Sequence, residues 1–304
     1  MIALVAAAPL LAVAKKSKVA NVRWCTYNVR CITTVDNEKG VGWDTRKDRA
    51  CQWVLDNDID VVGMQEVTHR QLLDILERLP QFDYVGVGRN DGKEAGEYTP
   101  VLFRKDKYKA LARGNFWLSE TPDRPGLGWD AACVRICTWG KFTRQNATDD
   151  EAFYFFNLHM DHVGVVARRE AAKLVVSKIP QIAGNSPVIL TGDFNVDQTD
   201  EIYSIFTNSG LLKDSYSAAR LRFAENGTFN SYDTGLYTHS RIDHIFVSPC
   251  WTVDAYGVLT DGYWTPDETS ASQLKGHDAP QEISFSHYTR RQPSDHYPVF
   301  VRLN

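Results

Sequence analysis

The sequence reads Ile189-Leu190-Thr191-Gly192-Asp193-Phe194-Asn195 a little beyond its midpoint, an apolar run that ends in a carboxylate and an amide. A short apolar, β-branched run bounded by a glycine is typical of a buried strand. Polar groups that follow such a strand lie at the mouth of a sheet, where sheet proteins build their sites. The stretch therefore predicts a sheet protein with functional groups at a strand end.

Other stretches of the chain also place acidic, amide or imidazole groups beside a β-rich run. They are Val62-Gly63-Met64-Gln65-Glu66, Arg241-Ile242-Asp243-His244 and Ser294-Asp295-His296-Tyr297-Pro298-Val299. One such pair alone means little. Their recurrence predicts that separate strands bring their polar ends to a common site.

Hydrophobic alternation and helical spacing follow one another along the chain. Strands are predicted at Val22–Val29, Ile59–Met64, Val101–Arg104, Ala131–Phe142, Phe153–Leu158, Val188–Thr191, Ile242–Val247 and Val299–Leu303. Helices are predicted from a capping box at Thr68 to Leu79, from an Asp44 cap through Val54, over Ala167–Ile179 with Pro180 ending it, and over Glu201–Phe206 before Gly210. This alternation predicts an α/β fold, and residues 20–304 are predicted to form a single catalytic domain. The helix-poor stretches 220–240 and 261–293 are predicted to be ordered loops around a site.

Composition narrows the class of protein. A hydrophobic content of 43% and an aromatic content of 12% suffice for a sizeable core and argue against disorder. The formal net charge of −4 and the pI near 6.1 provide no general basic field for long nucleic acid, although a local basic patch is compatible with them.

The N-terminus has the features of an export signal. Residues 2–13 are apolar, and Ala12-Val13-Ala14 precedes Lys15 in the manner of a cleavage site, although no Lys or Arg precedes the apolar run. Because a membrane span needs about 20 apolar residues, a retained anchor is the weaker alternative and no transmembrane segment is expected. Residues 1–14 are therefore predicted to be a signal segment, and the protein is predicted to be exported to the periplasm or the extracellular space.

Six cysteines permit disulfides in an exported protein without requiring them. Cys25 and Cys51 lie in strand and helix patterns, where a free thiol behaves as a small hydrophobe, so buried free thiols are favoured. Structural zinc is rejected because no cysteine or histidine set has ligand spacing.

Short motifs occur in the order Thr26-Tyr27-Asn28, Gln65-Glu66, Glu97-Tyr98, Asn157-Leu158-His159, Gly192-Asp193-Phe194-Asn195, Arg241-Ile242-Asp243 and Ser294-Asp295-His296. In identity and order they resemble the endonuclease/exonuclease/phosphatase superfamily from about residue 20 to the C-terminus. The resemblance implies a four-layer α/β sandwich of two mixed β-sheets flanked by helices. The stretches 116–122 and 128–130 resemble an exported branch more than the abasic-site repair enzymes.

Phosphoester hydrolysis gives these residues a common use. Charge builds on the non-bridging oxygens during in-line attack by water, so the site needs a metal, a water activator and hydrogen-bond donors. Hard oxygen ligands suit Mg²⁺, with Mn²⁺ as a substitute, and Mg²⁺ takes one or two protein carboxylates. Glu66 and Asp295 are predicted to be those carboxylates, and Asn28 is predicted to support them through an amide oxygen or a water.

Asp193 and Asn195 lie two residues apart, so they share a face if the strand geometry continues. Asp193 is predicted to orient or deprotonate the attacking water, and Asn195 to donate its amide to a phosphoryl oxygen. His296 is predicted to be a phosphate donor or proton carrier, and the family pattern implies that Asp243 fixes its tautomer. The residues leave open whether Asp193 or His296 is the base.

His159 resembles the second histidine of the family, which contacts the phosphate and pairs with a glutamate in the deoxyribonuclease branch. Glu97 is its predicted partner by position. Arg168 is predicted to reach a substrate phosphate from the N-terminus of the following helix, and Asp161 and His162 either line the cleft or turn the chain.

The leading hypothesis is a Mg²⁺-dependent phosphoesterase that cleaves a phosphodiester or phosphomonoester by direct water attack. One alternative is a secreted nuclease on extracellular DNA or RNA. Another is a binding module that kept the fold and lost turnover. The substrate is left open between nucleic acid, an inositol phosphate and a lipid head group, and no protein partner is implied.

Overall fold

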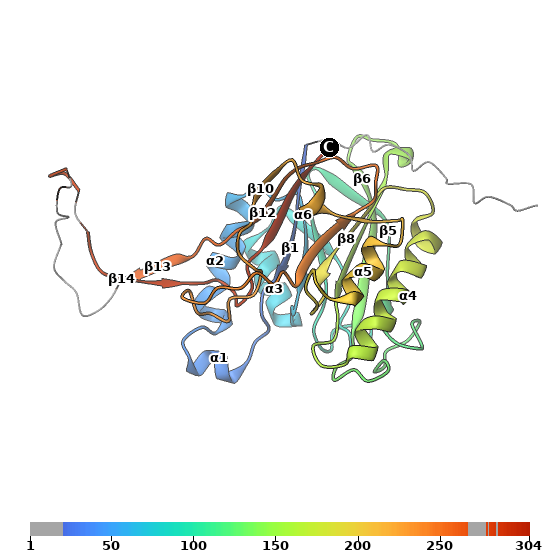
Figure 1. Cartoon of the computed structure of the whole chain (residues 1–304), viewed down its shortest axis with the longest axis horizontal. Coiled ribbons are helices and arrows are strands. Elements are labelled where there is room, and N and C mark those ends of the chain that lie inside the picture. Colours follow the sequence, from blue (N-terminus) through green and yellow to red (C-terminus); the bar gives the residue numbers. More distant parts are fainter. Residues whose placement is uncertain (1–20, 267–277, 279, 284) are drawn as a thin grey trace, which may run out of the picture.

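Two β-sheets lie face to face in the computed structural model, which describes residues 21–266, 278, 280–283 and 285–304 (Figure 1). The larger sheet has the order β10 (Leu221–Phe223), β12 (Val253–Val258), β15 (Val299–Leu303), β1 (Val22–Asn28), β2 (Val61–Gln65), β4 (Val101–Arg104) and β3 (Phe82–Val85). The smaller has the order β5 (Tyr108–Trp117), β6 (Ile136–Arg144), β7 (Phe153–His159), β8 (Val188–Asp193), β11 (Asp243–Val247) and β9 (Lys213–Asp214). The predicted signal segment, residues 1–14, lies outside the described residues.

Both sheets mix parallel and antiparallel pairs. In the larger sheet β1 runs parallel to β2 and antiparallel to β15, and in the smaller sheet β7 runs parallel to β8, which is antiparallel to β11. Parallel pairing places the carboxyl ends of two strands at the same edge. In the parallel pairs, Asn28 is therefore in register with Gln65, and Asp193 with His159. In the antiparallel pair, Asp193 lies opposite Asp243.

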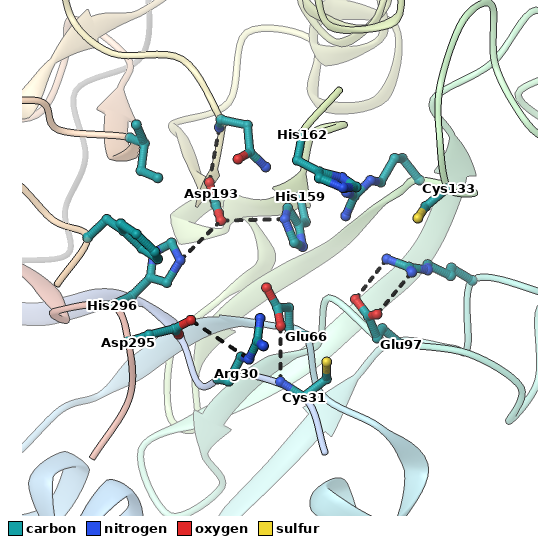
Figure 2. A pocket seen from close by; sticks show the side chains of 15 residues that line it. Arg30, Cys31, Glu66, Glu97, Cys133, His159, His162, Asp193, Asp295 and His296 are labelled. Atoms are coloured by element: carbon teal, nitrogen blue, oxygen red, sulfur yellow. Dashed lines mark hydrogen bonds and ion pairs between the residues drawn. The ribbon is translucent and has the colours of Figure 1, made fainter. Parts of the chain in front are cut away.

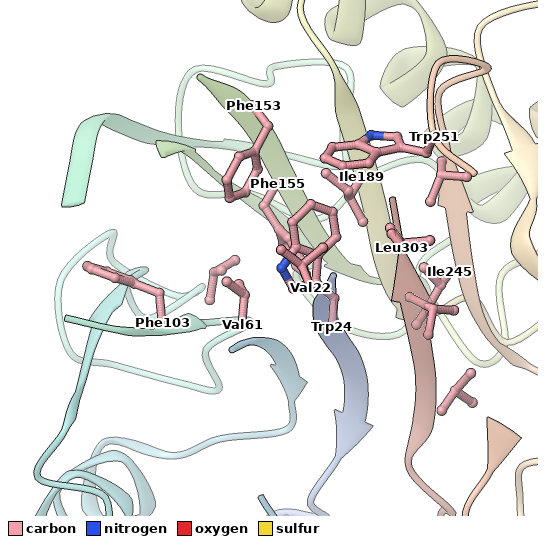
Figure 3. Packing of buried hydrophobic residues seen from close by; sticks show 14 of the residues in the cluster. Val22, Trp24, Val61, Phe103, Phe153, Phe155, Ile189, Ile245, Trp251 and Leu303 are labelled. Atoms are coloured by element: carbon pink, nitrogen blue, oxygen red, sulfur yellow. The ribbon is translucent and has the colours of Figure 1, made fainter. Parts of the chain in front are cut away.

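The core between the sheets combines large aromatic rings with aliphatic side chains (Figure 3). The Trp24 ring on β1 lies 4.9 Å from that of Phe153 and 5.9 Å from that of Phe155 on β7, and 4.9 Å from the Trp251 ring. Each of these side chains is buried. Burial of large aromatic side chains from both sheets holds them together, because each ring removes a large apolar area from water.

Helices form the outer layers and complete the predicted four-layer sandwich. The larger sheet is covered by α2 (Trp43–Asp56) and α3 (His69–Arg78), and the smaller by α4 (Val165–Ala183) and α5 (Glu201–Thr207). The predicted capping box is confirmed: Thr68 Oγ1 accepts from the Gln71 amide, and the Gln71 side chain accepts from the Thr68 amide. Short elements lie in the connections, namely α1 (Thr34–Glu38), η1 (Asp149–Glu151) and α6 (Ser215–Ala218).

Some boundaries differ from the prediction for local reasons. The helix α4 continues through Pro180 to Ala183, because proline removes only its own donor and Gly184 still bonds to the Pro180 carbonyl. The cap of α2 is Gly42, and Asp44 instead pairs with Lys47 within the helix. Strand β6 begins at Ile136, since the preceding residues turn around a buried carboxylate described below.

The stretch 261–293 forms a hairpin in its described part, β13 (Tyr263–Pro266) paired with β14 (Tyr288–Arg291), which projects from the sandwich (Figure 1). Neither strand lines the pocket described below. All six cysteines are free thiols, as favoured by their pattern, and Cys25 and Cys51 are buried. Among the described residues, none of the helices has the length and apolar character needed to cross a bilayer.

Candidate active site

A pocket of about 420 Å³ lies at the carboxyl ends of β1, β2, β7 and β8 (Figure 2). It collects side chains that are far apart in the sequence. Its lining consists of Arg30, Cys31, Glu66, Arg89, Glu97, Cys133, Arg135, His159, His162, Asp193, Asn195, Phe229, Ile242, Asp295 and His296. Of the predicted site residues, Asn28 and Asp243 lie behind this lining, and Arg168 is outside it.

Asp193 is at the centre of the site, at the end of β8. Its Oδ2 accepts a hydrogen bond from Asn28 Nδ2 at 3.0 Å and lies 3.4 Å from His159 Nε2 and 3.8 Å from His296 Nε2. Its Oδ1 accepts from the Asn195 amide at 3.0 Å. Burial, and then the negative charge of Asp243, raise the pKa of Asp193 to about 7.

His296 is held by the carboxylate that the sequence proposed for it. Asp243 Oδ2 lies 2.9 Å from His296 Nδ1, and a carboxylate accepts, so the Nδ1 proton points to Asp243 and Nε2 faces Asp193. Burial opposes protonation of His296, but Asp243 and Asp193 together raise its pKa well above the usual value. The ring therefore favours the imidazolium form, which can donate to a phosphoryl oxygen.

His159 differs from His296 in its electrostatics. It is buried, and burial followed by the positive charges of Arg135 and Arg89 lowers its pKa well below the usual value. The ring therefore favours the neutral form. Two histidines thus flank Asp193 with opposite tendencies to carry a proton, which suits one to hold charge and the other to donate a neutral hydrogen bond.

Glu66 follows β2 and turns out of the strand into the pocket. Its oxygens accept from Asn28 Nδ2 and from the Cys31 amide, both at 3.0 Å. Burial raises the pKa of Glu66, but these hydrogen bonds and the positive charges of His296 and Arg30 together outweigh burial and lower it. Glu66 and Asn195 both have left-handed backbones, with φ of 62° and 50°, which an L-residue adopts at a cost of about 1 kcal/mol or more.

Asp295 lies on the pocket wall near Glu66. Its side chain is 9% exposed, and Arg30 Nε lies 3.8 Å from its Oδ2. Burial raises the pKa of Asp295, and the charge of Glu66 raises it further against the opposing charge of His296. Asp295, which is buried, and Glu66, which is partly buried, are two carboxylates with unused oxygen lone pairs, and such a pair fits a hard divalent cation. Glu66, His159 and Asp193 also place possible ligand atoms within 4.8 Å of one another.

Asn28 supports Glu66, but through its amide nitrogen and not through the predicted amide oxygen. It is fully buried, its Nδ2 bridges the Glu66 and Asp193 carboxylates, and its Oδ1 accepts from the Arg30 amide at 2.9 Å. Its amide oxygen therefore faces the backbone. Asn28 holds two carboxylates side by side from below, and it does not present an oxygen to the pocket.

Glu97 pairs with Arg89 and not with His159 as predicted. Arg89 Nη1 and Nη2 donate to the two Glu97 oxygens at 2.8 and 2.9 Å, a bidentate pair. Burial raises the pKa of Glu97, although the Arg89 charge opposes this. Glu97, the expected partner of His159, is thus paired with Arg89, and His159 instead faces Asp193.

Arg135 enters the pocket from the residue just before β6. Its Nε donates to Asp161 at 3.3 Å, and its Nη2 donates to His162 Nδ1 at 3.0 Å. Asp161 is buried and accepts from the amides of Ala132, Cys133, Val163 and Gly164. Because the amides of Ala132 and Cys133 bond to Asp161, residues 131–135 do not form the predicted first part of the strand, which begins at Ile136.

Arg168 is directed away from the pocket. Its Nη1 donates to the Asp161 carbonyl at 2.9 Å, so it braces the loop that carries Asp161. The prediction that it reaches a substrate phosphate is therefore not supported by its position.

A buried polar network lies between the sheets one layer below the site. Gln65 Nε2 donates to Thr26 Oγ1 and Asn157 Oδ1, and Thr191 Oγ1 donates to the same Asn157 oxygen. Gly63 makes room for it, because a Cβ there would lie 2.5 Å from Asn157 Oδ1. Three members precede a site residue by two positions on their own strand, namely Thr26 before Asn28, Asn157 before His159 and Thr191 before Asp193.

Several lining residues were not predicted from the sequence. Arg30, Arg89 and Arg135 are isolated arginines in connecting segments, and no spacing marks them. Phe229 belongs to the predicted loop 220–240, and its ring lies 5.0 Å from that of His296. The only available signal was the position of that loop among the motifs.

Residues 25–296 match the model of the Endonuclease/Exonuclease/phosphatase family. The chain belongs to this family. It is 46% identical to the mannosyl-6-phosphatase of Bacteroides thetaiotaomicron, with 93% of this chain and 99% of that chain covered and a TM-score of 0.84. A family protein of the same organism is 45% identical, with 93% and 98% covered and a TM-score of 0.85. A protein of Acanthamoeba polyphaga mimivirus is 29% identical over 70% of this chain and 83% of its own length.

The family, its phosphatase relative and the geometry of the pocket agree on the class of reaction. The chain is a phosphoester hydrolase of the endonuclease/exonuclease/phosphatase family. Its predicted fold is confirmed by the two mixed sheets and by the similarity to solved members.

Proposed function

We propose that the protein is a divalent-cation-dependent phosphomonoesterase that hydrolyses a sugar 6-phosphate by direct attack of water. One observation carries the proposal. The buried Asp193 carboxylate lies between two histidines in the same pocket as the Glu66 and Asp295 carboxylates. This combination offers a water activator, phosphate donors and metal ligands within one small cavity.

The size and charge of the pocket support a small substrate. A volume of about 420 Å³ is in the range of small-molecule sites. The net charge of −4 gives no general basic field for long nucleic acid, which disfavours the nuclease alternative. The mannosyl-6-phosphatase relative, 46% identical over nearly the whole chain, directs the proposal to a phosphorylated hexose.

The proposed ion is Mg²⁺, with Mn²⁺ as a substitute, held by Glu66 and Asp295. Such an ion supplies positive charge to the phosphoryl oxygens as negative charge develops on them. These carboxylates also argue against a binding module that has lost turnover, because Asp295 is buried and Glu66 partly buried, at a cost that turnover explains.

The chain's own residues divide the remaining work. Asp193 accepts a proton from the attacking water or orients it, and Asn28 and the Asn195 amide fix the carboxylate. His296, held by Asp243, donates from Nε2 to a phosphoryl oxygen. Asn195 keeps one amide hydrogen on the Met160 carbonyl, which leaves the second hydrogen for the phosphate.

Phosphate release from mannose 6-phosphate tests the proposal. We expect release that EDTA abolishes and added Mg²⁺ restores, with much slower release from bis-p-nitrophenyl phosphate and from single-stranded DNA. Glu66→Gln is the matched variant, because it keeps the shape and removes the charge. Release that is equally fast with EDTA, or confined to the diester and DNA, would contradict the proposal.

We also propose export of the protein, supported by the apolar residues 2–13 and the Ala12-Val13-Ala14 sequence. Expression of the full chain followed by mass measurement of the N-terminus tests this. A mature protein beginning at Lys15 in the exported fraction is expected, and an intact N-terminus retained inside the cell would count against it.

A further inference from the structure

The pocket has two chemically different sides. Figure 2 shows His296 and Asp295 on one side and Glu97, Cys133 and His162 on the other. The first side carries the residues assigned above to hydrolysis. The second side is assigned no contact with the phosphate, although its arginines help to keep His159 neutral and its arginines and carboxylates are held in fixed geometry.

Hydrogen bonds between its residues leave defined donors and acceptors on the second side. The Arg135 side chain is 5% exposed. Its Nη1 has no hydrogen-bond acceptor among the described residues, and it is not fully shielded from solvent, so it can donate to a ligand. Because a guanidinium only donates, His162 Nδ1 is the acceptor in its contact with Arg135, and the neutral ring carries its proton on Nε2. His162 is exposed at the rim, so this proton is available to a ligand.

The acceptor on this side is Glu97. Both of its oxygens already accept from Arg89, but a carboxylate has about four lone-pair sites, and the side chain remains 22% exposed in the pocket. The second side therefore offers donors from Arg135 and His162 beside acceptors from Glu97. Hydroxyl groups both donate and accept, so they complement such a set.

Charge decides between a hydroxylated ligand and a second anionic group. Arg89 is paired with Glu97, and Arg135 with Asp161, so two positive charges are balanced by two negative ones. A balanced set gives no net attraction for a second phosphate or a carboxylate. It favours a neutral polar ligand, because neutral hydroxyls lose less hydration than an anion would.

We propose that Arg135, His162 and Glu97 form a specificity subsite that binds the ring hydroxyls of the sugar whose phosphate is cleaved on the Asp193 side. This inference rests on the proposed function and adds the residues that select the leaving group. Cleavage of a phosphate that lacks hydroxyls then depends on the first side alone, whereas cleavage of a sugar phosphate depends on both.

The test compares two phosphate monoesters in the full chain. With His162→Phe, kcat/KM for mannose 6-phosphate is expected to fall about ten-fold, the effect of a lost hydrogen bond, mainly through KM. For p-nitrophenyl phosphate, which has no hydroxyls, the change is expected to stay below about two-fold. His239→Phe is the control, because His239 is exposed and does not line this pocket.

A second variant addresses Arg135 without removing its charge. Arg135→Lys keeps a cation near Asp161 and loses the planar fork, so it is expected to reproduce the sugar-specific loss. Equal losses on both substrates, or no loss on the sugar phosphate, overturn the subsite and leave the phosphatase assignment standing. A bisphosphorylated hexose that is cleaved more than about ten-fold faster than mannose 6-phosphate, with that gain lost in Arg135→Lys, also overturns it.

A binding measurement separates failure of the subsite from failure of the proposed function. Methyl α-D-mannopyranoside is titrated into the protein while the imidazole signals of His162 are followed by NMR. If neither monoester is cleaved but the His162 signals shift, the subsite stands and the phosphatase assignment falls. If those signals do not shift, the subsite is overturned whether or not the monoesters are cleaved.

Discussion

Gln65 on β2 donates from Nε2 to Asn157 Oδ1 on β7 at 2.7 Å, across the interface between the two sheets. Asn157 also donates to the carbonyls of Met64 at 2.7 Å and Pro100 at 3.1 Å. Glu66 is the residue after Gln65, and His159 lies two residues beyond Asn157. This pair therefore fixes the distance between the two strand ends that carry the site.

Replacement of Asn157 by Leu is expected to destabilise the fold by about 2–4 kcal/mol, because it leaves several buried partners unpaired. We also expect kcat to fall, since His159 and Glu66 lose their common support. Urea denaturation and steady-state kinetics measure the two effects. Thr138→Val is the control: Thr138 bonds to Thr99 between the sheets at 3.2 Å, outside this network. Similar effects of both variants would refute a special role for Asn157.

Asp243→Asn is expected to lower the pKa of His296, because Asp243 is the foremost of the charges that raise it. If the imidazolium donates to the phosphate, activity is lost as pH rises through that pKa. The basic limb of the kcat/KM profile is therefore expected at lower pH in the variant, with kcat reduced about 100-fold or more. An unchanged basic limb would show that His296 is not the group that titrates there.

The identity of the base is tested by Asp193→Ala and His296→Ala. Each is expected to lower kcat about 100-fold or more, and the acidic limb of the pH profile is expected to vanish only in the variant that lacks the base. We expect that variant to be Asp193→Ala, because burial raises the pKa of Asp193 to about 7, close to a working pH. Near wild-type turnover in either variant would remove that residue from the mechanism.

Mg²⁺ is expected to raise the melting temperature of the wild-type protein, because an ion that binds only the folded state adds about 2.7 kcal/mol at 100 times its Kd. Glu66→Gln and Asp295→Asn are expected to lose most of this shift. Glu97→Gln is the matched control, since it removes a pocket carboxylate that is paired with Arg89. A full shift in the Glu66 and Asp295 variants would place the ion elsewhere.

Because His244 is buried in its neutral form, we expect the free energy of unfolding to fall in acid. Its ring is buried against Phe194 and Phe246, and its Nε2 lies 2.9 Å from the Val196 carbonyl. Its Nδ1 has no hydrogen-bond partner within the described part of the chain. Burial lowers its pKa. The unfolded chain, with an ordinary pKa of about 6.5, therefore binds more protons, and stability is full above that pH and declines below it.

His244→Gln keeps the donor and removes the titration. Between pH 7.5 and 5.0 we expect the variant to lose about 1–2 kcal/mol less unfolding free energy than the wild type, measured by urea denaturation in EDTA. His239→Gln, on an exposed histidine, is expected to leave the pH dependence unchanged. Parallel curves for wild type and His244→Gln would exclude His244 as the titrating group.

The sequence predicts the parts of the site that follow a strand. Asp193, His159 and Glu66 each lie where an apolar run ends, and the pairing of β1 with β2 and of β7 with β8 converts that pattern into proximity. The contact between Asp243 and His296 was anticipated from the family pattern. These features are local, or depend on strand register that periodicity encodes.

The hydrogen-bond partners of Glu97 and Arg135 could not be predicted from the sequence. Glu97 meets Arg89 within one loop that folds back on itself, and nothing in the spacing distinguishes Arg89 from a surface arginine. Asp161 draws four backbone amides and Arg135 around itself, which overrides the strand propensity of residues 131–135. Such arrangements depend on which loops meet, and a single sequence does not specify this.

The left-handed backbone at Glu66 sets stability and chemistry against each other. Glycine tolerates that conformation without strain, so Glu66→Gly is a substitution that the backbone alone would favour. The same exchange deletes the carboxylate assigned to the ion. Laboratory selection for heat tolerance alone would therefore tend to replace Glu66 by glycine. Selection for heat tolerance together with turnover would keep the glutamate, and the two selections compared would reveal the conflict.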